Sequence, residues 1–374
     1  MAPELALERL PKEPARVLDQ MMGSGTIPVL AGAAGHSATG YDLDPLALLI
    51  AEVWGRPLDF EAYLLAAESV AEQARESEPG EVPSEDAETL EFIERWFDEV
   101  ARGRLAALTH AIGDQQDELH PALWCAFSRL IITKDIGASL ARDVSHSRPH
   151  KVRECTDFDP IANYARSARE VARRHATLSE TRPDPADLVF DRVDARELPL
   201  EDDSIDMAMT SPPYLSAIDY LRGHRLSLVW MGYTLAELRD LRGSVVGAER
   251  ARHDGEDHEE LIEKTLGKRA PARTRGVLRR YLYDLHAIMN ETVRVLKAGG
   301  SATFVIADAT LFGISVALGD VIDSLARKVG LECIERIQRE LPADRRYLPP
   351  PGHGRPSDLT RRVRHEVCLG YVAP

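Results

Sequence analysis

Short apolar segments alternate with longer segments of helical periodicity along much of this chain. The short ones are typical of buried strands, and the longer ones of helices that cover a sheet. The pattern predicts strands at Arg16–Asp19, Ala38–Asp42, Leu188–Arg192, Ile205–Thr210, Ser301–Ile306, Leu331–Arg339 and His365–Val372. It predicts helices between them, notably at Thr26–Gly35, Pro45–Val53 and Tyr281–Leu296. Such alternation indicates an α/β fold with a doubly wound sheet.

Two long segments interrupt this alternation. About 130 residues separate the second and third predicted strands, far more than an ordinary connection requires, so we expect residues 55–185 to form an inserted helical subdomain. Residues 215–280 form a second insertion. The sheet is thereby assigned to residues 1–54 and 186–374. Helix-compatible periodicity within the first insertion is found at Leu105–His110, Ala122–Thr133 and Ile161–Thr177.

The turn that follows Thr210, Ser211-Pro212-Pro213-Tyr214, is the most informative feature of the sequence. Because proline lacks a backbone donor and has a fixed φ, the two prolines end the strand that precedes them. The rigid turn presents a hydroxyl, free carbonyls and an aromatic face at the carboxyl end of a strand, the edge where ligands bind to open α/β sheets. A planar substrate could stack on Tyr214 while its amino group bonds to Ser211 and the Pro212 carbonyl.

A glycine-rich turn, Gly23-Ser24-Gly25-Thr26, follows the first predicted strand. Glycines in such strand–turn–helix units let the backbone approach a nucleotide closely. Asp42 lies at the tip of the second strand, roughly 20 residues later, which is the spacing of a carboxylate that binds ribose hydroxyls. The turn has neither the Gly-x-Gly-x-x-Gly pattern nor a P-loop lysine, so a nucleoside without a pyrophosphate fits it better.

Together these elements resemble the S-adenosylmethionine-dependent amino-methyltransferases of DNA, which methylate exocyclic nitrogens of bases. The family's first motif, Asp-Pro-Phe-x-Gly-Ser-Gly-Thr, corresponds to Asp19–Thr26, with Gln20 and Met21 in place of Pro and Phe. Its catalytic motif corresponds to Ser211–Tyr214, and the serine form is commonest among enzymes that methylate N4 of cytosine. Two further blocks follow in the expected order, around Asp194 and over Leu296–Ile306.

The resemblance implies a class I methyltransferase sheet of seven mostly parallel strands that ends in an antiparallel hairpin, and S-adenosylmethionine as cofactor. Asp42 would hold the ribose of the cofactor and Asp194 its adenine. The implied catalytic residues are Ser211, Pro212, Pro213 and Tyr214. The implied cofactor-binding residues are Asp19, Met21, Gly23, Ser24, Gly25, Thr26, Asp42, Asp194 and Thr210.

The expected mechanism is direct methyl transfer to a base that is flipped out of a duplex or taken from a single strand. Ser211 and the Pro212 carbonyl would polarise the amine, and positioning and electrostatics would supply most of the acceleration. No metal and no covalent nucleophile are required. Adenine N6, an RNA base and a catalytically idle module that only binds the cofactor stay open as alternatives.

Simpler interpretations exist for the same residues. Gly-Ser-Gly turns occur in α/β proteins of many functions. One of Asp42 and Asp44 is expected to cap the helix that follows them, and we assign the ribose to Asp42. The Pro-Pro-Tyr turn could be only a chain reversal, with Tyr214 as a core residue. The four blocks in order favour the methyltransferase interpretation.

Composition agrees with a cytoplasmic enzyme. The chain has four cysteines without paired spacing, which argues against a zinc site or a disulfide framework. No apolar run approaches the length of a membrane span. The formal net charge of −15 is unexpected for a DNA-binding protein, because cations that face phosphates dominate such contacts.

The charge is, however, unevenly distributed. Glu76–Glu91 is acidic and is expected to be an exposed loop. Basic runs lie at Arg142–Arg153, at Lys268–Arg275 with Arg279 and Arg280, and at Arg345–Tyr347 with Arg361–Arg364. DNA is the expected partner, RNA is an alternative, and a restriction or defence partner is left open. Contacts with nucleic acid are expected from Arg142, Arg148, Lys151 and Arg153, and from Tyr220 and Arg222 in the second insertion, a candidate for target recognition.

Overall fold

The computed structural model describes residues 3–78, 80–115, 118–132, 136–141, 150–179, 188–215, 220–247, 258–340 and 365–374. The chain divides into two units. The first comprises Met1–Leu43, Ala186–Ile218 and Leu241–Pro374, and the second comprises Asp44–Pro185 and Asp219–Asp240.

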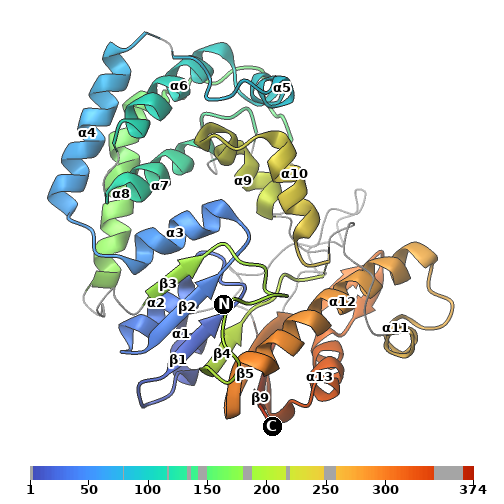
Figure 1. Ribbon diagram of the computed structural model, residues 1–374. Coiled ribbons are helices and arrows are strands. Elements are labelled where there is room, and N and C mark those ends of the chain that lie inside the picture. Colours follow the sequence, from blue (N-terminus) through green and yellow to red (C-terminus); the bar gives the residue numbers. More distant parts are fainter. Residues whose placement is uncertain are drawn as a thin grey trace. The chain divides into compact units, whose positions relative to one another are not determined.

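The described part of the first unit contains a seven-stranded sheet in the order β3-β2-β1-β4-β5-β9-β8 (Figure 1). Its strands are β1 (Arg16–Asp19), β2 (Ser37–Tyr41), β3 (Leu188–Asp191), β4 (Ile205–Thr210), β5 (Leu296–Ala307), β8 (Glu332–Glu340) and β9 (His365–Val372). Strands β1 to β5 are parallel to one another, and β9 is antiparallel to its neighbours β5 and β8. The predicted class I methyltransferase sheet, with its terminal antiparallel hairpin, is confirmed.

Alternate residues of the central strands face two helical layers. Val17 and Met207 belong to a core that includes residues of α1 and α2. Leu18 and Ala208 are the next residues along the same strands and belong to a larger core with α11, α12 and α13. Successive side chains of a strand point to opposite faces, so both faces are buried and the strands read as apolar runs. The helices of this unit are α1 (Pro3–Arg9), α2 (Thr26–Ala33), α11 (Glu259–Leu266), α12 (Ala272–Val295) and α13 (Leu318–Lys328).

Two details of the sheet differ from the prediction. The strand predicted to begin at Ser301, after a turn at Leu296–Gly300 that the family resemblance implies, already begins at Leu296, which pairs with Ile205 before the register shifts. Gly299 has a φ of +74°, which only glycine adopts without strain, within this irregular stretch. A short hairpin of β6 (Ala309–Leu311) and β7 (Ile314–Val316) was not predicted, because strands of this length show no readable periodicity.

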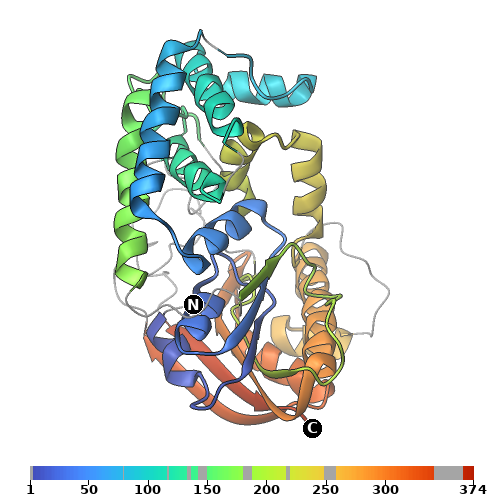
Figure 2. The same ribbon diagram turned by 60° about the vertical axis from the view of Figure 1, so that its left-hand side comes forward.

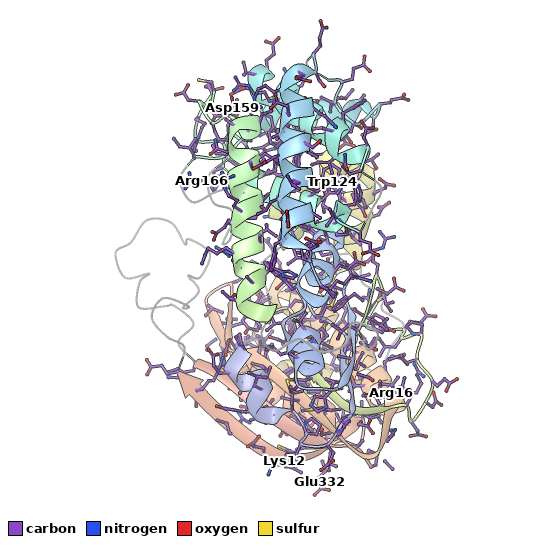
Figure 3. All side chains as sticks on the ribbon, turned by 90° about the vertical axis from the view of Figure 1, so that its left-hand side faces the viewer. Lys12, Arg16, Trp124, Asp159, Arg166 and Glu332 are labelled. Carbon is purple, nitrogen blue, oxygen red and sulfur yellow. The ribbon has the colours of Figure 1, made fainter. Side chains whose placement is uncertain are left out.

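The second unit is helical in its described part. Helices α4 and α8 run side by side, as Figures 2 and 3 show. Tyr63 of α4 and Tyr164 of α8 are buried and donate their hydroxyls to carbonyls of α7. Its helices are α3 (Pro45–Gly55), α4 (Phe60–Glu76), α5 (Ala87–Trp96), α6 (Glu99–Gly113), α7 (His120–Ile131), α8 (Pro160–Ser179), α9 (Tyr220–Leu228), the 3₁₀ helix η2 (Val229–Met231) and most of α10 (Leu235–Ser244). No helix within the described ranges is long and apolar enough to cross a membrane.

Aspartates begin several of these helices. Asp59, Asp86 and Asp98 accept hydrogen bonds from backbone N–H groups in the first turns of α4, α5 and α6. The prediction of a loop throughout Glu76–Glu91 is wrong in its second part, since α5 begins at Ala87. The apolar residues that anchor α5, such as Phe92, Ile93 and Trp96, lie beyond the acidic stretch.

Candidate active site

The carboxyl ends of β1, β2 and β4 meet at one edge of the sheet. Asp19 is the last residue of β1, Thr210 is the last residue of β4, and Asp42 directly follows β2. The strand order reverses at β1, which has β2 on one side and β4 on the other. Ligands of open α/β sheets bind at such a reversal. The sheet therefore brings the glycine turn, Asp42 and the Ser-Pro-Pro-Tyr turn to one edge.

Asp19 and Thr210 join the two central strands. The Thr210 hydroxyl donates to Oδ1 of Asp19 at 2.7 Å, and both residues are buried. The Met21 backbone N–H donates to the same oxygen at 3.1 Å. Burial raises the pKa of Asp19 to about 7, although these hydrogen bonds oppose the shift. Asp19 is therefore a carboxyl group that a nearby positive charge would convert to its ionised form near neutral pH.

The glycine turn and Asp42 are in direct contact. The backbone N–H of Gly23 donates to Oδ2 of Asp42 at 2.8 Å, so the two predicted nucleoside-binding elements form one structure. Gly23 and Gly25 have φ values of +54° and +79°, which explains the need for glycine at both positions. A Cβ atom at Gly23 would meet no atom within 4 Å. The backbone at Gly23 thus borders open space that a ligand could approach.

The two aspartates after β2 have different partners. Asp44 caps α3, since its Oδ1 accepts the N–H of Leu46 at 2.9 Å. It also contacts His224 of α9 within the second unit. Asp42 contacts the glycine turn instead. The prediction that one of these two aspartates caps the helix is confirmed for Asp44, and the ribose contact of Asp42 stays a prediction.

The Ser211 hydroxyl acts as a hydrogen-bond donor within the protein. It donates to the backbone carbonyl of Val305 in β5 at 3.0 Å. A hydroxyl has one donor hydrogen and two acceptor lone pairs, so the lone pairs of Ser211 remain as acceptors. The carbonyl of Pro212 has no hydrogen-bond partner within the described residues. Two neutral acceptors on consecutive residues therefore lie at the carboxyl end of β4.

Contacts from distant elements hold the turn. The Tyr281 hydroxyl of α12 donates to the Pro213 carbonyl at 2.9 Å. The Tyr214 hydroxyl donates to Oε1 of Glu366 in β9 at 3.2 Å. Arg339 of β8 in turn donates two hydrogen bonds to Glu366, at 2.7 and 2.9 Å. No motif marks Tyr281, Glu366 or Arg339 in the sequence, because each contact links residues far apart in the chain.

Asp194 is engaged by its neighbour Arg196. The Arg196 guanidinium donates to both carboxylate oxygens of Asp194, at 2.9 and 2.6 Å. Arg196 also donates to the buried Asp284 of α12 at 2.6 Å, and these carboxylates raise its pKa. Each carboxylate oxygen can accept more than one hydrogen bond. The predicted contact of Asp194 with adenine therefore has to use the lone pairs that Arg196 leaves.

The departures from the family motif have different consequences. Gln20 is buried and donates from Nε2 to Thr292 of α12 at 2.8 Å, so it ties the glycine turn to that helix. Met21 is half-buried, Ser24 is exposed and Thr26 begins α2. Gln20 thus has a structural partner that no sequence motif indicates.

The predicted nucleic-acid contacts lie in the second unit or outside the described residues. Arg142 and Arg148 fall outside them, as does the side chain of Tyr220. Lys151 is paired with Glu154 at 2.7 Å. Arg153 and Arg222 are half-buried. The role of all these residues in nucleic-acid binding stays a prediction.

Sequence comparison identifies two curated relatives. No protein-family model matches the chain. The chain is 25% identical over 159 residues to the Type II methyltransferase M.AvaI of Nostoc sp., across 37% of this chain. It spans only 33% of the length of M.AvaI. It is 22% identical over 387 residues to the Type II methyltransferase M.MvaI of Kocuria varians, across 92% of this chain and 83% of that relative. The chain is similar to type II methyltransferases. The family resemblance that the motifs indicated is thus confirmed.

Solved structures match more weakly. Among them are S-adenosylmethionine-dependent methyltransferases from Methanosarcina mazei (10% identity, TM-score 0.35, covering 100% of this chain and 98% of that chain). Another is a TehB-like methyltransferase from Corynebacterium glutamicum (10% identity, TM-score 0.33, covering 100% and 86%). Likeness at this level carries no argument, so the fold class rests on the strand order and direction.

Proposed function

We propose that the protein is an S-adenosylmethionine-dependent methyltransferase that acts on the exocyclic amine of a DNA base, with N4 of cytosine preferred to N6 of adenine. The observation that carries the proposal is the hydrogen bond from Ser211 to the Val305 carbonyl. This bond leaves the Ser211 hydroxyl as an acceptor. It lies beside the Pro212 carbonyl, which has no hydrogen-bond partner among the described residues. Two adjacent acceptors suit the two hydrogens of an amino group. Similarity to type II methyltransferases supports the assignment.

The glycine turn fits the cofactor. Asp42 would accept the ribose hydroxyls, and the open space at Gly23 would admit the methionine portion. The positive charge of the cofactor would favour the ionised form of Asp19, whose pKa burial raises to about 7 in the free protein. Asp194 would bind the adenine with its remaining lone pairs. The cofactor supplies an electrophilic methyl group when bound.

The chain's own residues position the target amine. The base stacks on Tyr214, whose ring is fixed by the bond from its hydroxyl to Glu366. Ser211 and the Pro212 carbonyl accept the amine hydrogens and concentrate electron density on the nitrogen that attacks the methyl group. Both acceptors are neutral and weakly basic, so the displaced proton leaves to solvent. Fixed dipoles and positioning thus carry the acceleration.

The domain roles belong to this proposal. The catalytic domain comprises residues 1–54 and 186–374, and residues 55–185 form an inserted subdomain. Residues 215–280, which directly follow the catalytic turn, contribute to target recognition. DNA is the proposed substrate because the chain is similar to type II methyltransferases and carries the Ser-Pro-Pro-Tyr turn.

Mass spectrometry of nucleosides tests this function. DNA and RNA are incubated separately with the protein and labelled S-adenosylmethionine, then digested to nucleosides. We expect label in N4-methylcytosine from DNA. Label in N6-methyladenine would change the assigned target base to adenine, and label only in RNA would change the assigned substrate from DNA to RNA. Cofactor binding without transfer to either nucleic acid would contradict the proposal in favour of an idle module.

Tyr214→Ala is expected to weaken binding of the target base by about 1–3 kcal/mol, the cost of removing one aromatic stacking face. Tyr214→Phe keeps the ring and removes the hydroxyl that bonds to Glu366, so its effect should be much milder. The measurement is the KM for DNA, with cofactor affinity as control. Equal KM values for Tyr214→Ala and the parent would rule out the stacking role.

Binding of S-adenosylmethionine is expected to weaken as pH falls below about 7. The free protein holds Asp19 protonated there, because burial raises its pKa to about 7. The permanent positive charge of the sulfonium group favours ionised Asp19, so binding at lower pH requires release of a proton. Affinity should fall by at most tenfold per pH unit, since one unit corresponds to about 1.4 kcal/mol. Calorimetry between about pH 5.5 and 7.5 checks this slope.

The matched variant is Asp19→Asn. Its amide oxygen can still accept from Thr210, but it cannot ionise, so this contribution to the pH slope should vanish. In the parent, the raised pKa of the Asp19 carboxyl also makes the stability of the free protein depend on pH. A raised carboxyl pKa favours the folded state below the ordinary value of 3.8, and that contribution is lost as pH rises through about 7. A pH slope in the variant equal to that of the parent would exclude Asp19 as its source.

A further inference from the structure

A cavity of about 460 Å³ lies apart from the residues described above, between the beginning of α12 and the hairpin of β6 and β7. The hairpin follows β5 at the carboxyl edge of the sheet. Helix α12 ends where β5 begins, so its first turns lie toward that same edge (Figure 1). The cavity is thus within the first unit and on the edge that carries the Ser-Pro-Pro-Tyr turn. It is lined by Ala272, Arg273, Gly276, Val277, Arg280 and Phe312.

The four arginines in the first turns of α12 fall into two groups. Arg275 and Arg279 are paired with Glu259. Arg273 and Arg280 line the cavity and have no carboxylate partner among the described residues, and the cavity lining contains no acidic residue. The Nε atom of Arg280 is buried without a hydrogen-bond partner in the same described part of the chain. An unsatisfied guanidinium donor is costly, and a bound anion would satisfy it.

Phe312 lies at the tip of the hairpin in a position that does not suit it. Phe312 and Gly313 form the two-residue loop and both have positive φ, at +49° and +87°. Such loops favour Asn-Gly, so a bulky phenylalanine here is strained. Its side chain is 57% exposed, and the Arg273 guanidinium lies over its ring at 4.7 Å. Neither turn geometry nor core packing accounts for this residue, whereas a ligand that stacks on it would.

We propose that this cavity binds the DNA strand that carries the target base, with Arg273 and Arg280 contacting phosphates and Phe312 stacking on an unpaired base. The inference rests on the proposed function, which supplies the strand. Unpaired arginines next to an exposed aromatic ring are the combination that single-stranded nucleic acid requires. An acidic peptide would satisfy the arginines but would not use the ring, so the chemistry favours nucleic acid.

Salt-dependent binding to a labelled single-stranded oligonucleotide tests the proposal. Arg273→Gln and Arg280→Gln should each reduce the slope of log K against log salt concentration by up to about one. Phe312→Leu should weaken binding by about 5- to 150-fold with little change in slope, because it removes only stacking. Phe312→Gly should behave likewise and fold at least as well, since glycine suits the positive φ. Melting temperatures and cofactor affinity report folding in each variant.

The matched control is Lys12→Gln. Lys12 is exposed and precedes β1, so it lies at the amino edge of the sheet (Figure 3). This variant makes the same change of charge away from the cavity and should keep the parent slope. If the arginine and phenylalanine variants bind like Lys12→Gln, the cavity proposal is wrong.

The outcomes also separate this proposal from the proposed function. A parent protein that binds the oligonucleotide through these residues but transfers no methyl group would refute the function and support the cavity. A parent that methylates DNA while all four cavity variants keep parental affinity and KM would refute the cavity alone. Polyglutamate that competes for Arg273 and Arg280 as strongly as DNA, with no effect of Phe312→Leu, would overturn the assignment to nucleic acid.

Discussion

Replacement of Ser211 by alanine is expected to slow methyl transfer by about 10²- to 10³-fold, the usual effect of removing one hydrogen bond that stabilises a transition state. The parent hydroxyl donates to the Val305 carbonyl and therefore presents lone pairs to the amine. Alanine removes that acceptor where charge develops on the nitrogen. Cofactor affinity should not change, because Ser211 contacts neither the glycine turn nor Asp42 in the structure. Single-turnover rates at saturating DNA and cofactor measure the effect.

Two variants make the result specific. Ser204→Ala removes a similar hydroxyl-to-carbonyl bond, from Ser204 to Glu201 at 2.7 Å, just before the amino end of β4. It should leave the rate unchanged. Ser211→Asn restores an oxygen acceptor and should recover part of the activity. A parental rate for Ser211→Ala would refute the catalytic role of the turn, and an equal loss for Ser204→Ala would assign the effect to stability.

The strands of the central sheet could be predicted because burial on both faces leaves a readable apolar run. The ends of β1, β4 and β9 coincide with prediction for this reason. The start of β5 could not be predicted, since its glycines read as a turn although Gly299 lies in an irregular part of the strand. The length of the loop between α4 and α5 was overestimated. The first turn of α5, which Asp86 caps, is acidic and therefore reads like the exposed segment before it.

The candidate site was predictable only where neighbouring residues carry the chemistry. The turn of Ser211–Tyr214 and the glycine turn are local motifs, and so is the cap at Asp44. The supports of the site are not local. Gln20 bonds to Thr292, 272 residues away, and Tyr214 bonds to Glu366, 152 residues away. Such contacts depend on which strands become neighbours, and a single sequence carries no direct signal of that pairing.

Asp42→Ala is expected to weaken S-adenosylmethionine binding by about 1.5–3 kcal/mol, the range for hydrogen bonds to a charged group. A carboxylate offers about four acceptor positions, and one of those on Asp42 accepts the Gly23 N–H. The substitution removes both the ribose acceptors and the bond that holds the Gly23 N–H. Calorimetry with the parent and the variant measures the loss directly.

Two controls separate these contributions. Asp42→Asn keeps an oxygen acceptor for Gly23 but loses the charge, so it should bind more weakly than the parent and more tightly than Asp42→Ala. Asp44→Ala removes the cap of α3, two residues away, and should lower thermal stability by about 0.5–2 kcal/mol without a comparable loss of affinity. Undiminished affinity in Asp42→Ala would refute the ribose assignment. Equal losses of affinity in the Asp42 and Asp44 variants would instead show that the region acts through stability, because Asp42 accepts the Gly23 N–H whereas Asp44 caps α3.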